Sequence, residues 1–596
     1  MSDFNSRLAA LGPELQALYH TLYHTLPEEE RSRSYEQLLT SLRTMAGERP
    51  DALQAQDEKR EAEPGWYRRR ELLGMCLYVG PYAGTLQGVS QRLPYLEECG
   101  VNCLHLMPLL DTFDGESDGG YAVADFRKVK PGLGTMDDLE ALTSACRERG
   151  MLCCMDFVMN HTARAHEWAR RAAAGEKEYQ DRYFFYDDRT IPDAFEQTVP
   201  QVFPTTAPGS FTWCEEAGKY VMTSFYPYQW DLNYGNPEVL RLMAENMLFL
   251  ANRGVDIIRI DAVPYIWKEL GTSCRNLPQV HLIVRMFRLI TELVCPGVIL
   301  LGEVVMAPEK LAPYFGTPEK PECHMLYNAT AMCTLWHTAA TQDARLLRHQ
   351  LQTLAALPKE QLFLNYLRCH DDIGWGLDYP FLRRFGMEET PHKAFLNAWF
   401  CGELPGSAGR GERYNDDPTL GDARLCGTAA SLTGIQAALN SGDSEALETA
   451  IRLDLMLHAF VLGQSGLPIL YAGDEIAQLN DEAYRCDPLK ADDSRYLHRG
   501  AFSTEAAERR HDPQSVEGRI FRGLQVLLAL RRAHPAFGIE AEITVPDTED
   551  DAILIMERRT PDDAVTLIYN FSRENRSVAF GGKTHELPPC GYVWLT

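Results

Sequence analysis

Apolar positions along this chain change their spacing twice, and each change predicts a different kind of structure. Over residues 1–64 they recur every three or four positions, the period of an amphipathic helix, which predicts a helical N-terminal domain. Over residues 65–533 short apolar runs alternate with amphipathic helical stretches, a pattern that favours a parallel sheet covered by helices. Over residues 534–596 alternating strands are separated by turn residues, which predicts a C-terminal antiparallel β-sandwich.

Seven of the apolar runs have strand length, and polar residues follow most of them. The runs are GMCLYVG, VNCLHLMPLL, GMLCCMDFVMNH, GVDIIRIDAV, GVILLGEVV, LFLNYLRCHDD and LPILYAGDE. The polar residues at their ends are Asp156, Asn160, His161, Asp261, Glu303, Asp371, Asp474 and Glu475. Because a (β/α)8 barrel gathers its functional groups at the C-terminal ends of its strands, this pattern predicts an α/β protein built on a TIM barrel. The stretch from Glu303 to Asp371 is about twice the roughly 31 residues of one strand–helix unit, so a further strand is expected inside it.

Two stretches are too long for ordinary connections between a strand and a helix. The barrel is expected to use residues 65–160, 234–372 and 434–533. Residues 161–233, rich in aromatics and proline, are expected to form an inserted domain after the third strand. Residues 373–433, rich in glycine and charge, are expected to form a second inserted domain after the seventh strand.

Composition narrows the classes of function. With 596 residues and a net charge of −26, the chain suits an enzyme for a neutral or cationic substrate better than a protein that binds nucleic acid or an anionic membrane. No signal-peptide pattern opens the sequence, and the longest apolar stretch is interrupted by His458, Gln464 and Pro468. The 16 cysteines show no pairing pattern, which favours buried reduced thiols and a cytoplasmic location.

Three acidic residues follow three different strands: Asp261, Glu303 and Asp371. A single aspartate at such a place is usually a turn or helix-capping residue. Three acids together with the strand-end histidines His161 and His370 predict one catalytic cavity instead.

The neighbours of two of these acids predict different protonation states. Arg259 lies two positions before Asp261 on the same face of its strand, where its charge would lower the pKa of Asp261 and keep a nucleophile ionised. Glu303 follows the apolar run VILLG, which would raise its pKa and keep a general acid protonated. One charged and one neutral carboxyl group is the arrangement that cleaves glycosidic bonds.

Several motifs resemble the signature regions of the alpha-amylase superfamily of glycoside hydrolases. They are DFVMNH, GVDIIRIDAV, GEVV and the pair His370–Asp371. Within that superfamily the chain resembles the amylosucrases most, through SDGGYAV, NHTARAHEWA, FYPYQWDLNYGNP, DAVPYIWK, CHDDIGW, GDARLCGTAASL and DDSRYLHR. The resemblance covers nearly the whole chain, including the N-terminal helices, both insertions and the terminal β domain.

The resemblance to amylosucrases implies a retaining glucosyltransferase that cleaves sucrose, releases fructose and transfers the glucosyl unit to an α-1,4-glucan or glycogen acceptor. It implies that Asp261 attacks the anomeric carbon, while Glu303 protonates the departing oxygen and later deprotonates the acceptor. Asp371 would hold sugar hydroxyls in the distorted transition state, with His161 and His370 donating hydrogen bonds. No cofactor is implied.

The same resemblance assigns residues to the glucosyl pocket. Asp118 and Arg495 would form a salt bridge that closes its far end. Tyr121 would stack under the glucosyl ring, and Phe225 and Gln229 would line the wall.

On the other side of the scissile bond, Asp372 and Arg424 would face the fructosyl ring, so that Asp372 distinguishes this chain from amylases in general. One position departs from the family pattern. Pro200, in VPQVFP, stands where an arginine of the acceptor side is expected, which leaves the acceptor and the balance of transfer and hydrolysis open. Asn160 and His161 lie where some amylases bind calcium, but no cluster of oxygen ligands accompanies them, so no metal site is expected.

Three alternatives stay open beside the transferase. One is a sucrose hydrolase with water as the main acceptor, and another is a sucrose isomerase, which the N-terminal helices and the second insertion fit less well. The third is an inactive carbohydrate-binding protein of the same fold, against which the presence of all three acids and Arg259 argues. Both a monomer and a homodimer are compatible with the sequence.

Retaining chemistry predicts a distance between the two reacting carboxyl groups. Those of Asp261 and Glu303 are expected about 5–5.5 Å apart, because the nucleophile attacks the sugar directly and no water has to fit between them. A crystal structure measures this separation, and a gap of about 6.5–9.5 Å, as in inverting enzymes, would contradict the mechanism.

Overall fold

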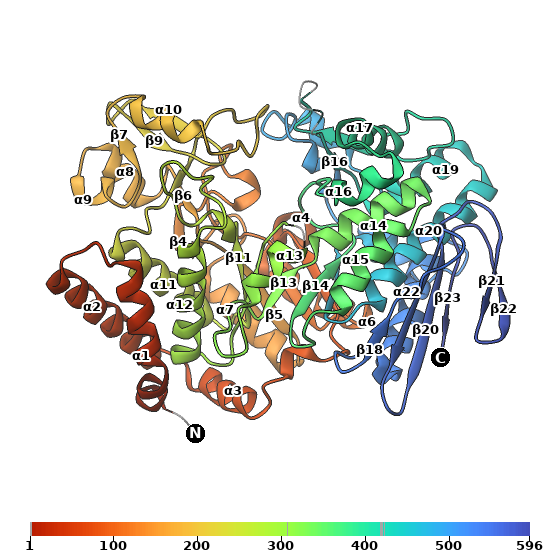
Figure 1. Cartoon of the computed structure of the whole chain (residues 1–596), viewed down its shortest axis with the longest axis horizontal. Coiled ribbons are helices and arrows are strands. Elements are labelled where there is room, and N and C mark those ends of the chain that lie inside the picture. The colour runs from red at the N-terminus through yellow and green to blue at the C-terminus, as the bar shows by residue number, and fades with distance from the viewer. Residues whose placement is uncertain (1–2, 307, 418–420, 422) are drawn as a thin grey trace.

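The computed structural model describes residues 3–306, 308–417, 421 and 423–596 (Figure 1). Asp422, within the motif GDARLCG, lies outside the described residues. At the centre, eight parallel strands close into a barrel. In barrel order they are β1 (Gly74–Leu77), β2 (Cys103–Leu106), β5 (Leu152–Val158), β11 (Ile257–Asp261), β12 (Ile299–Gly302), β13 (Met325–Tyr327), β14 (Leu362–Tyr366) and β17 (Leu467–Tyr471). The prediction of a (β/α)8 barrel is therefore confirmed.

Two barrel strands differ from the sequence pattern. β13 has only three residues, too few for the apolar pattern to reveal it. The pattern extends β14 to Cys369, whereas the strand ends at Tyr366. Beyond this point the Arg368 guanidinium pairs with the buried Asp474 carboxylate at 2.7 Å. Contacts between side chains thus take the place of backbone hydrogen bonds between strands.

Helices cover the outside of the barrel. Short helices follow β1, and longer ones follow most of the other strands. They are α4 (Val79–Ala83), α5 (Leu86–Gln91), α6 (Leu93–Glu98), α7 (Met136–Glu148), α11 (Pro237–Ala251), α12 (Pro278–Val294), α13 (Pro308–Leu311), α14 (Ala329–Thr341), α15 (Arg345–Ala355), α20 (Ser444–Gly463) and α22 (Val516–Ala533). In α12 the apolar positions recur with the helical period and are buried, so hydrophobic burial against the barrel holds the helix in place.

Three N-terminal helices pack on the barrel helices: α1 (Phe4–Leu22), α2 (Glu28–Gly47) and α3 (Asp51–Ala62). α1 lies against α12 and α2 lies against α11. A salt bridge of 2.7 Å joins Glu14 of α1 to Arg285 of α12. The predicted helical segment is therefore in contact with the barrel along much of its length.

The two insertions lie at the same end of the barrel, at the top of Figure 1. The first contains β6 (His161–Ala163), α8 (Glu167–Ala173), α9 (Lys177–Gln180), β7 (Phe185–Tyr186), α10 (Thr190–Glu196), β8 (Phe211–Cys214), β9 (Lys219–Met222) and β10 (Gln229–Asp231). The second contains α16 (Tyr379–Leu382), α17 (Glu389–Phe400), β15 (Glu412–Tyr414), β16 (Arg424–Cys426) and α18 (Ala429–Leu432), and α19 (Ile435–Ser441) follows it. The exact domain boundaries stay predictions.

The C-terminal part consists of antiparallel strands. β18 (Glu542–Thr544), β19 (Ile553–Arg559), β20 (Ala564–Asn570) and β23 (Tyr592–Leu595) form one sheet, and β21 (Arg576–Phe580) and β22 (Lys583–Leu587) form a hairpin. Ile555 and Ile568 of the sheet and Val578 and Leu587 of the hairpin belong to one buried apolar cluster. The two layers therefore share a small core of their own.

The 16 cysteines are all unpaired, and 13 of them are buried. Within the described part of the chain, no helix combines the length and the apolar character needed to cross a membrane.

Two buried arginines, one from the barrel helix α22 and one from the C-terminal sheet, meet at the end of α20. Arg531 of α22 donates from Nη1 to the carbonyl oxygens of Leu462 and Gln464, at 2.6 and 2.7 Å. Arg558 of β19 donates from Nη1 to the carbonyl of Gly463, at 3.2 Å. The last carbonyls of a helix lack partners within it and carry partial negative charge, so guanidinium groups satisfy them well.

Replacing Arg531 by methionine should destabilise the protein by about 3 kcal/mol or more, because several buried carbonyls lose their donor at once. Urea or thermal unfolding followed by circular dichroism measures this loss. Arg519→Met is the matched control, since Arg519 lies on the same helix but pairs with Glu448 at the partly exposed surface. A control within about 0.5 kcal/mol of wild type is expected, and an equal loss in both variants would contradict the assignment.

Candidate active site

A cavity of about 470 Å³ opens at the C-terminal ends of the barrel strands. Most of the residues predicted for the site line it, together with residues of both insertions. The predicted ones are Asp118, Tyr121, His161, Phe225, Arg259, Asp261, Glu303, Asp371, Asp372, Arg424 and Arg495. Gln229 and His370 lie behind this lining and contact Asp118 and Tyr121, respectively. The structure thus brings all thirteen predicted residues to one place.

One guanidinium holds three carboxylates at the floor of the cavity. Arg259 of β11 is almost fully buried, and its Nη1 lies 2.6 Å from Oδ1 of Asp261 and 2.5 Å from Oδ1 of Asp156. Its Nη2 lies 2.8 Å from Oε1 of Glu303. The strand register explains the first contacts, because Arg259 stands directly opposite Asp156 on β5. The two predicted reacting carboxyl groups are therefore bound to the same cation.

The predicted division of charge between the two acids is not what the structure gives. Burial and the nearby Glu303 carboxylate raise the pKa of Asp261 well above its usual value, although Arg259 opposes this. Glu303 does not lie in apolar surroundings, since Arg259 and the Ala262 N–H, at 3.0 Å, both donate to its carboxylate. The prediction failed because one strand's own sequence does not show that a neighbouring carboxylate reaches the same guanidinium.

The turn after Asp261 places a backbone N–H group within hydrogen-bonding distance of Glu303. Ala262 has φ 49°, in the left-handed region that is costly for a residue with a side chain. This bend points its N–H at the Glu303 carboxylate. Such strain at the end of a barrel strand is maintained when surrounding contacts over-determine the geometry, and it is often found at functional sites.

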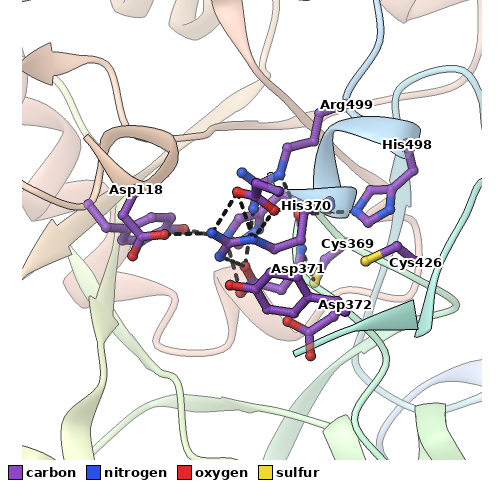
Figure 2. A network of polar contacts seen from close by, with 12 residues as sticks. Asp118, Cys369, His370, Asp371, Asp372, Cys426, His498 and Arg499 are labelled. Atoms are coloured by element: carbon purple, nitrogen blue, oxygen red, sulfur yellow. Dashed lines mark hydrogen bonds and ion pairs between the residues drawn. The ribbon is translucent and has the colours of Figure 1, made fainter. Parts of the chain in front are cut away.

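Asp371 faces the cavity from the loop after β14, and two arginines lie near it. Nη2 of Arg499 is 3.4 Å and Nη1 of Arg495 is 3.8 Å from Oδ1 of Asp371. Although burial opposes it, these charges help to hold the pKa of Asp371 below its usual value. Arg499 also donates to the carbonyl of His370 at 2.6 Å, as does His498 at 3.1 Å, and Figure 2 shows both side chains approaching His370 from the same side. Asp371 is therefore kept as a fixed carboxylate.

Tyr121 and two histidines form the wall beside Asp371. The Tyr121 ring stacks on His370 with centroids 5.2 Å apart, and its hydroxyl lies 2.6 Å from Nε2 of His370. His161 donates from Nε2 to the Tyr121 carbonyl at 3.1 Å, and the Phe225 ring packs on it at 5.3 Å. Burial lowers the pKa of His161 to about 4 and that of His370 to about 3, so both rings are neutral near pH 7.

The predicted ion pair between Asp118 and Arg495 lines the cavity. Nη2 of Arg495 lies 2.8 Å from Oδ1 of Asp118 and 2.8 Å from Oδ2 of Asp493, which confirms the expected Asp118–Arg495 salt bridge. Gln229 donates from Nε2 to Oδ2 of Asp118 at 3.2 Å, so it positions this pair rather than lining the wall. Burial raises the pKa of Asp118, and Arg495 acts against this shift.

Asp372 and Arg424 also line the cavity, and their charged groups lie 3.6 Å apart. In Figure 2 the Asp372 carboxylate lies apart from the dashed contacts around Asp371, so the adjacent aspartates serve different parts of the cavity. Burial raises the pKa of Asp372, opposed by Arg424. Arg424 also donates to the Val202 carbonyl at 3.0 Å. Nearby, the Pro200 carbonyl accepts a hydrogen bond of 2.7 Å from Arg275.

A lysine takes the position where a cation could be expected beside Asn160. Lys268 Nζ donates to Oδ1 of Asn160 at 2.7 Å and lies 3.1 Å from Oδ2 of Asp231, with both ionic side chains fully buried. Among the described residues, one group of three potential metal ligands lies close together, Cys369, His370 and Asp371. Two of them, His370 and Asp371, also make the contacts described above.

Sequence reasoning missed several residues of the site. Asp156 was recognised only as a strand-end residue, although it pairs with both Arg259 and His105. Arg499 and Arg275 were not assigned at all. Asp156 could have been found from its position opposite Arg259 on the neighbouring strand. Arg499 could have been found from its place at the end of the motif DDSRYLHR, four residues after Arg495.

The fold and the paired carboxyl groups define an enzyme that acts on glycosidic bonds. The alpha-amylase catalytic-domain model matches residues 50–372, more than half of the chain, so the chain belongs to the alpha-amylase family. A glucosylglycerate phosphorylase of Allomeiothermus silvanus is 30% identical over 506 residues, which cover 83% of this chain and 84% of that protein. A trehalose synthase of Pimelobacter sp. is 31% identical over 324 residues, 52% of this chain and only 56% of that protein.

A solved structure, the sucrose 6F-phosphate phosphorylase from Thermoanaerobacter thermosaccharolyticum, superposes with a TM-score of 0.65 over 87% of this chain and 98% of that chain. Its sequence identity is 20%, so this is a likeness of fold. The relatives thus act on several different glycosides, as their names state, and the choice among activities depends on the cavity itself.

Removal of the Arg259 charge should move the acid limb of the pH–rate profile to higher pH. Arg259 lowers the pKa of Asp261, so Arg259→Gln should raise it further, and Asp261 would then be protonated at a pH where it is ionised in wild type. A shift of about one pH unit or more in kcat/KM is expected, reported by the coupled pair of acids. Arg259→Lys, which keeps a charge, should shift less, and a profile that does not move in Arg259→Gln would contradict the role.

Proposed function

We propose that this protein is a retaining glucosyltransferase that uses sucrose as its donor, releases fructose and transfers the glucosyl unit to an α-1,4-glucan acceptor. The proposal combines the family, the paired carboxyl groups and the shape of the cavity. Its acceptor would be glycogen or another glucan chain. Within the family, this activity would give a role both to the Asp118–Arg495 pair and to the Asp372–Arg424 pair.

The proposal rests chiefly on the Asp118–Arg495 ion pair, which would close one end of the cavity. The Asp118–Arg495 pair, supported by Asp493, stands behind the place where a glucosyl ring would contact Tyr121. A buried ion pair there leaves room for one terminal ring and no continuing chain. The donor is therefore a small glucoside such as sucrose rather than the interior of a glucan.

The proposed reaction is a double displacement. Asp261 attacks the anomeric carbon, and the bond to fructose breaks as Glu303 gives a proton to the leaving oxygen. An acceptor hydroxyl then attacks the β-glucosyl-enzyme and gives its proton back to Glu303, while Asp261 leaves as a carboxylate. Two inversions retain the α configuration. Asp371, held ionised by Arg495 and Arg499, would bind sugar hydroxyls as the ring flattens.

Asp372 and Arg424 support a fructosyl site next to the acid. Both line the same cavity as Glu303, and in this proposal they contact the leaving group. The carboxylate would accept hydrogen bonds from fructosyl hydroxyls and the guanidinium would donate to others. After fructose has left, the same groups would receive the end of the acceptor glucan.

The test is the product profile from sucrose, with and without glycogen. We expect free fructose in excess over free glucose, and the missing glucose in an insoluble glucan that stains with iodine. Equal amounts of glucose and fructose would identify a hydrolase, and a rearranged disaccharide would identify an isomerase. No release of fructose from sucrose would reject the proposed donor.

A matched pair of variants checks the roles of the two acids. Glu303→Gln should reduce fructose release at least about a hundredfold, since the leaving oxygen then departs without its proton. Arg519→Gln, which removes a surface charge far from the cavity, should leave the rate unchanged. Unchanged fructose release in Glu303→Gln would reject the mechanism.

A further inference from the structure

One buried histidine near the cavity joins two parts of the chain that lie far apart in the sequence. His498 is the last residue of a short 3-10 helix, Ser494–His498, in the segment after β17. Its Nδ1 accepts a hydrogen bond of 3.2 Å from the N–H of Gly427, just after β16 in the second insertion. Its Nε2 donates to the carbonyl of His370 at 3.1 Å, in the loop after β14 (Figure 2). One imidazole therefore connects the second insertion with the loop that carries Asp371.

The partners of His498 allow only one form of its ring. A backbone N–H can only donate a hydrogen bond, and a backbone carbonyl can only accept one. Nδ1 must therefore be without a hydrogen and Nε2 must carry one, which is the neutral Nε2–H tautomer. Burial, with the charges of Arg368 and Arg499, also lowers the pKa of His498 well below its usual value, although the His370 carbonyl and Asp371 oppose this. The ring is therefore kept neutral.

The carbonyl that His498 holds belongs to the peptide bond between His370 and Asp371. Because this peptide bond is planar, a donor that fixes the carbonyl oxygen also fixes the direction in which the chain enters Asp371. Arg499, the next residue, donates to the same oxygen at 2.6 Å and lies 3.4 Å from Oδ1 of Asp371. Two successive residues after β17 thus hold the peptide group from which this carboxylate projects.

At its other end, the link reaches the segments that carry Asp372 and Arg424. Leu425 exchanges two backbone hydrogen bonds with Ile373, of 2.8 and 3.1 Å, so these segments lie side by side. Asp372 directly precedes Ile373 and Arg424 directly precedes Leu425, and both line the cavity. Gly427 stands two residues after Leu425. A movement of Gly427 would therefore also displace the pair that the proposed function assigns to the leaving group.

Two further contacts anchor the second insertion on the segment after β17. The Thr428 N–H donates to Oδ1 of Asn480 at 2.8 Å, and the Ser494 hydroxyl donates to the carbonyl of Arg413 in β15 at 2.9 Å. These contacts do not involve the imidazole of His498. The insertion should therefore stay in place when that ring is replaced, so a change at His498 can be tested in a folded protein.

We propose that His498 is a positioning residue that holds the Asp371 turn and the Asp372–Arg424 segments in one fixed relation, through a single neutral tautomer. It lies behind the residues that line the cavity, so it would act through its two backbone partners. Its Nε2–H would govern the rate of the chemical step, because Asp371 has to meet the flattened sugar ring in the transition state. Its Nδ1 would govern binding of the leaving group. The inference rests on the proposed function only for this last assignment.

Two substitutions separate the two hydrogen bonds. The amide of His498→Gln reaches the position of Nε2 and can still donate to the His370 carbonyl, but it leaves no acceptor for the Gly427 N–H. The amide of His498→Asn has its oxygen at the position of Nδ1 and can still accept from Gly427, but it does not reach the carbonyl. With sucrose as donor, His498→Asn should lower kcat about tenfold with little change in KM, the loss expected for one buried hydrogen bond. His498→Gln should instead raise KM about fivefold to tenfold with little change in kcat.

His166→Asn is the matched control. His166 is a buried histidine of the first insertion, and its Nδ1 accepts a hydrogen bond of 3.1 Å from the N–H of Trp168, as the asparagine oxygen also can. This variant should change neither constant. The proposal is overturned if both His498 variants change kcat and KM alike, as a general loss of stability would cause, or if neither variant changes either constant.

A second measurement needs no substrate and so separates this inference from the proposed function. NMR of the full-length protein, labelled at the histidine ring nitrogens, should show His498 as the neutral Nε2–H tautomer between about pH 8 and pH 5. The ring signals of His370, assigned with His370→Gln, should move in His498→Asn and stay in place in His498→Gln. A His498 ring that gains a proton in this range, or His370 signals that respond equally to both variants, would contradict the proposal. The expected signals without release of fructose would reject only the proposed donor.

Discussion

The contact on which the site depends is a single buried guanidinium that holds three carboxylates. Arg259 pairs with Asp156, Asp261 and Glu303, and its burial removes the water that would otherwise screen their mutual repulsion. Without this cation, three acids at the ends of neighbouring strands would repel one another and protonate or spread apart. The closed barrel supplies the necessary register, because it fixes β5, β11 and β12 side by side. The arrangement of these strands and the arrangement of the acids therefore both depend on the buried charge of Arg259.

Across the cavity a second set of charges has the opposite arrangement. Here one carboxylate, Asp371, lies near two arginines, Arg495 and Arg499, which both come from the segment after β17. The cavity thus lies between Arg259, which is surrounded by carboxylates, and Asp371, which is surrounded by guanidinium groups. In the proposed mechanism, the carboxylates on both sides would stabilise a sugar ring passing through a positively charged transition state, while the arginines keep those carboxylates in place. The two insertions then determine what can lie outside this ring.

The barrel could be predicted because its strands are continuous apolar runs, and the strand-end acids stood out against them. The spacing between Glu303 and Asp371 indicated a further strand, but the position of the three-residue β13 could not be predicted, since so short a strand leaves no periodic signal. The direction of the pKa shift of Asp261 was predicted wrongly, because the sequence places Arg259 beside Asp261 but says nothing of Glu303 reaching over from the next strand. Arg275 and Arg499 act through long-range contacts of loops, which no local pattern encodes. The motifs led to the residues that line the cavity, whereas the contacts between its loops are revealed only by the structure.

The arginines at the end of α20 have a consequence for the order in which the molecule assembles. α20 leads into β17, the last strand of the barrel, yet the groups that complete its end, Arg531 and Arg558, come later in the chain. As a nascent chain leaves the ribosome, all eight barrel strands are available before these side chains. The carbonyls at the end of α20 therefore stay without these donors until α22 and the terminal sheet have been synthesised, although every reacting residue of the site precedes both.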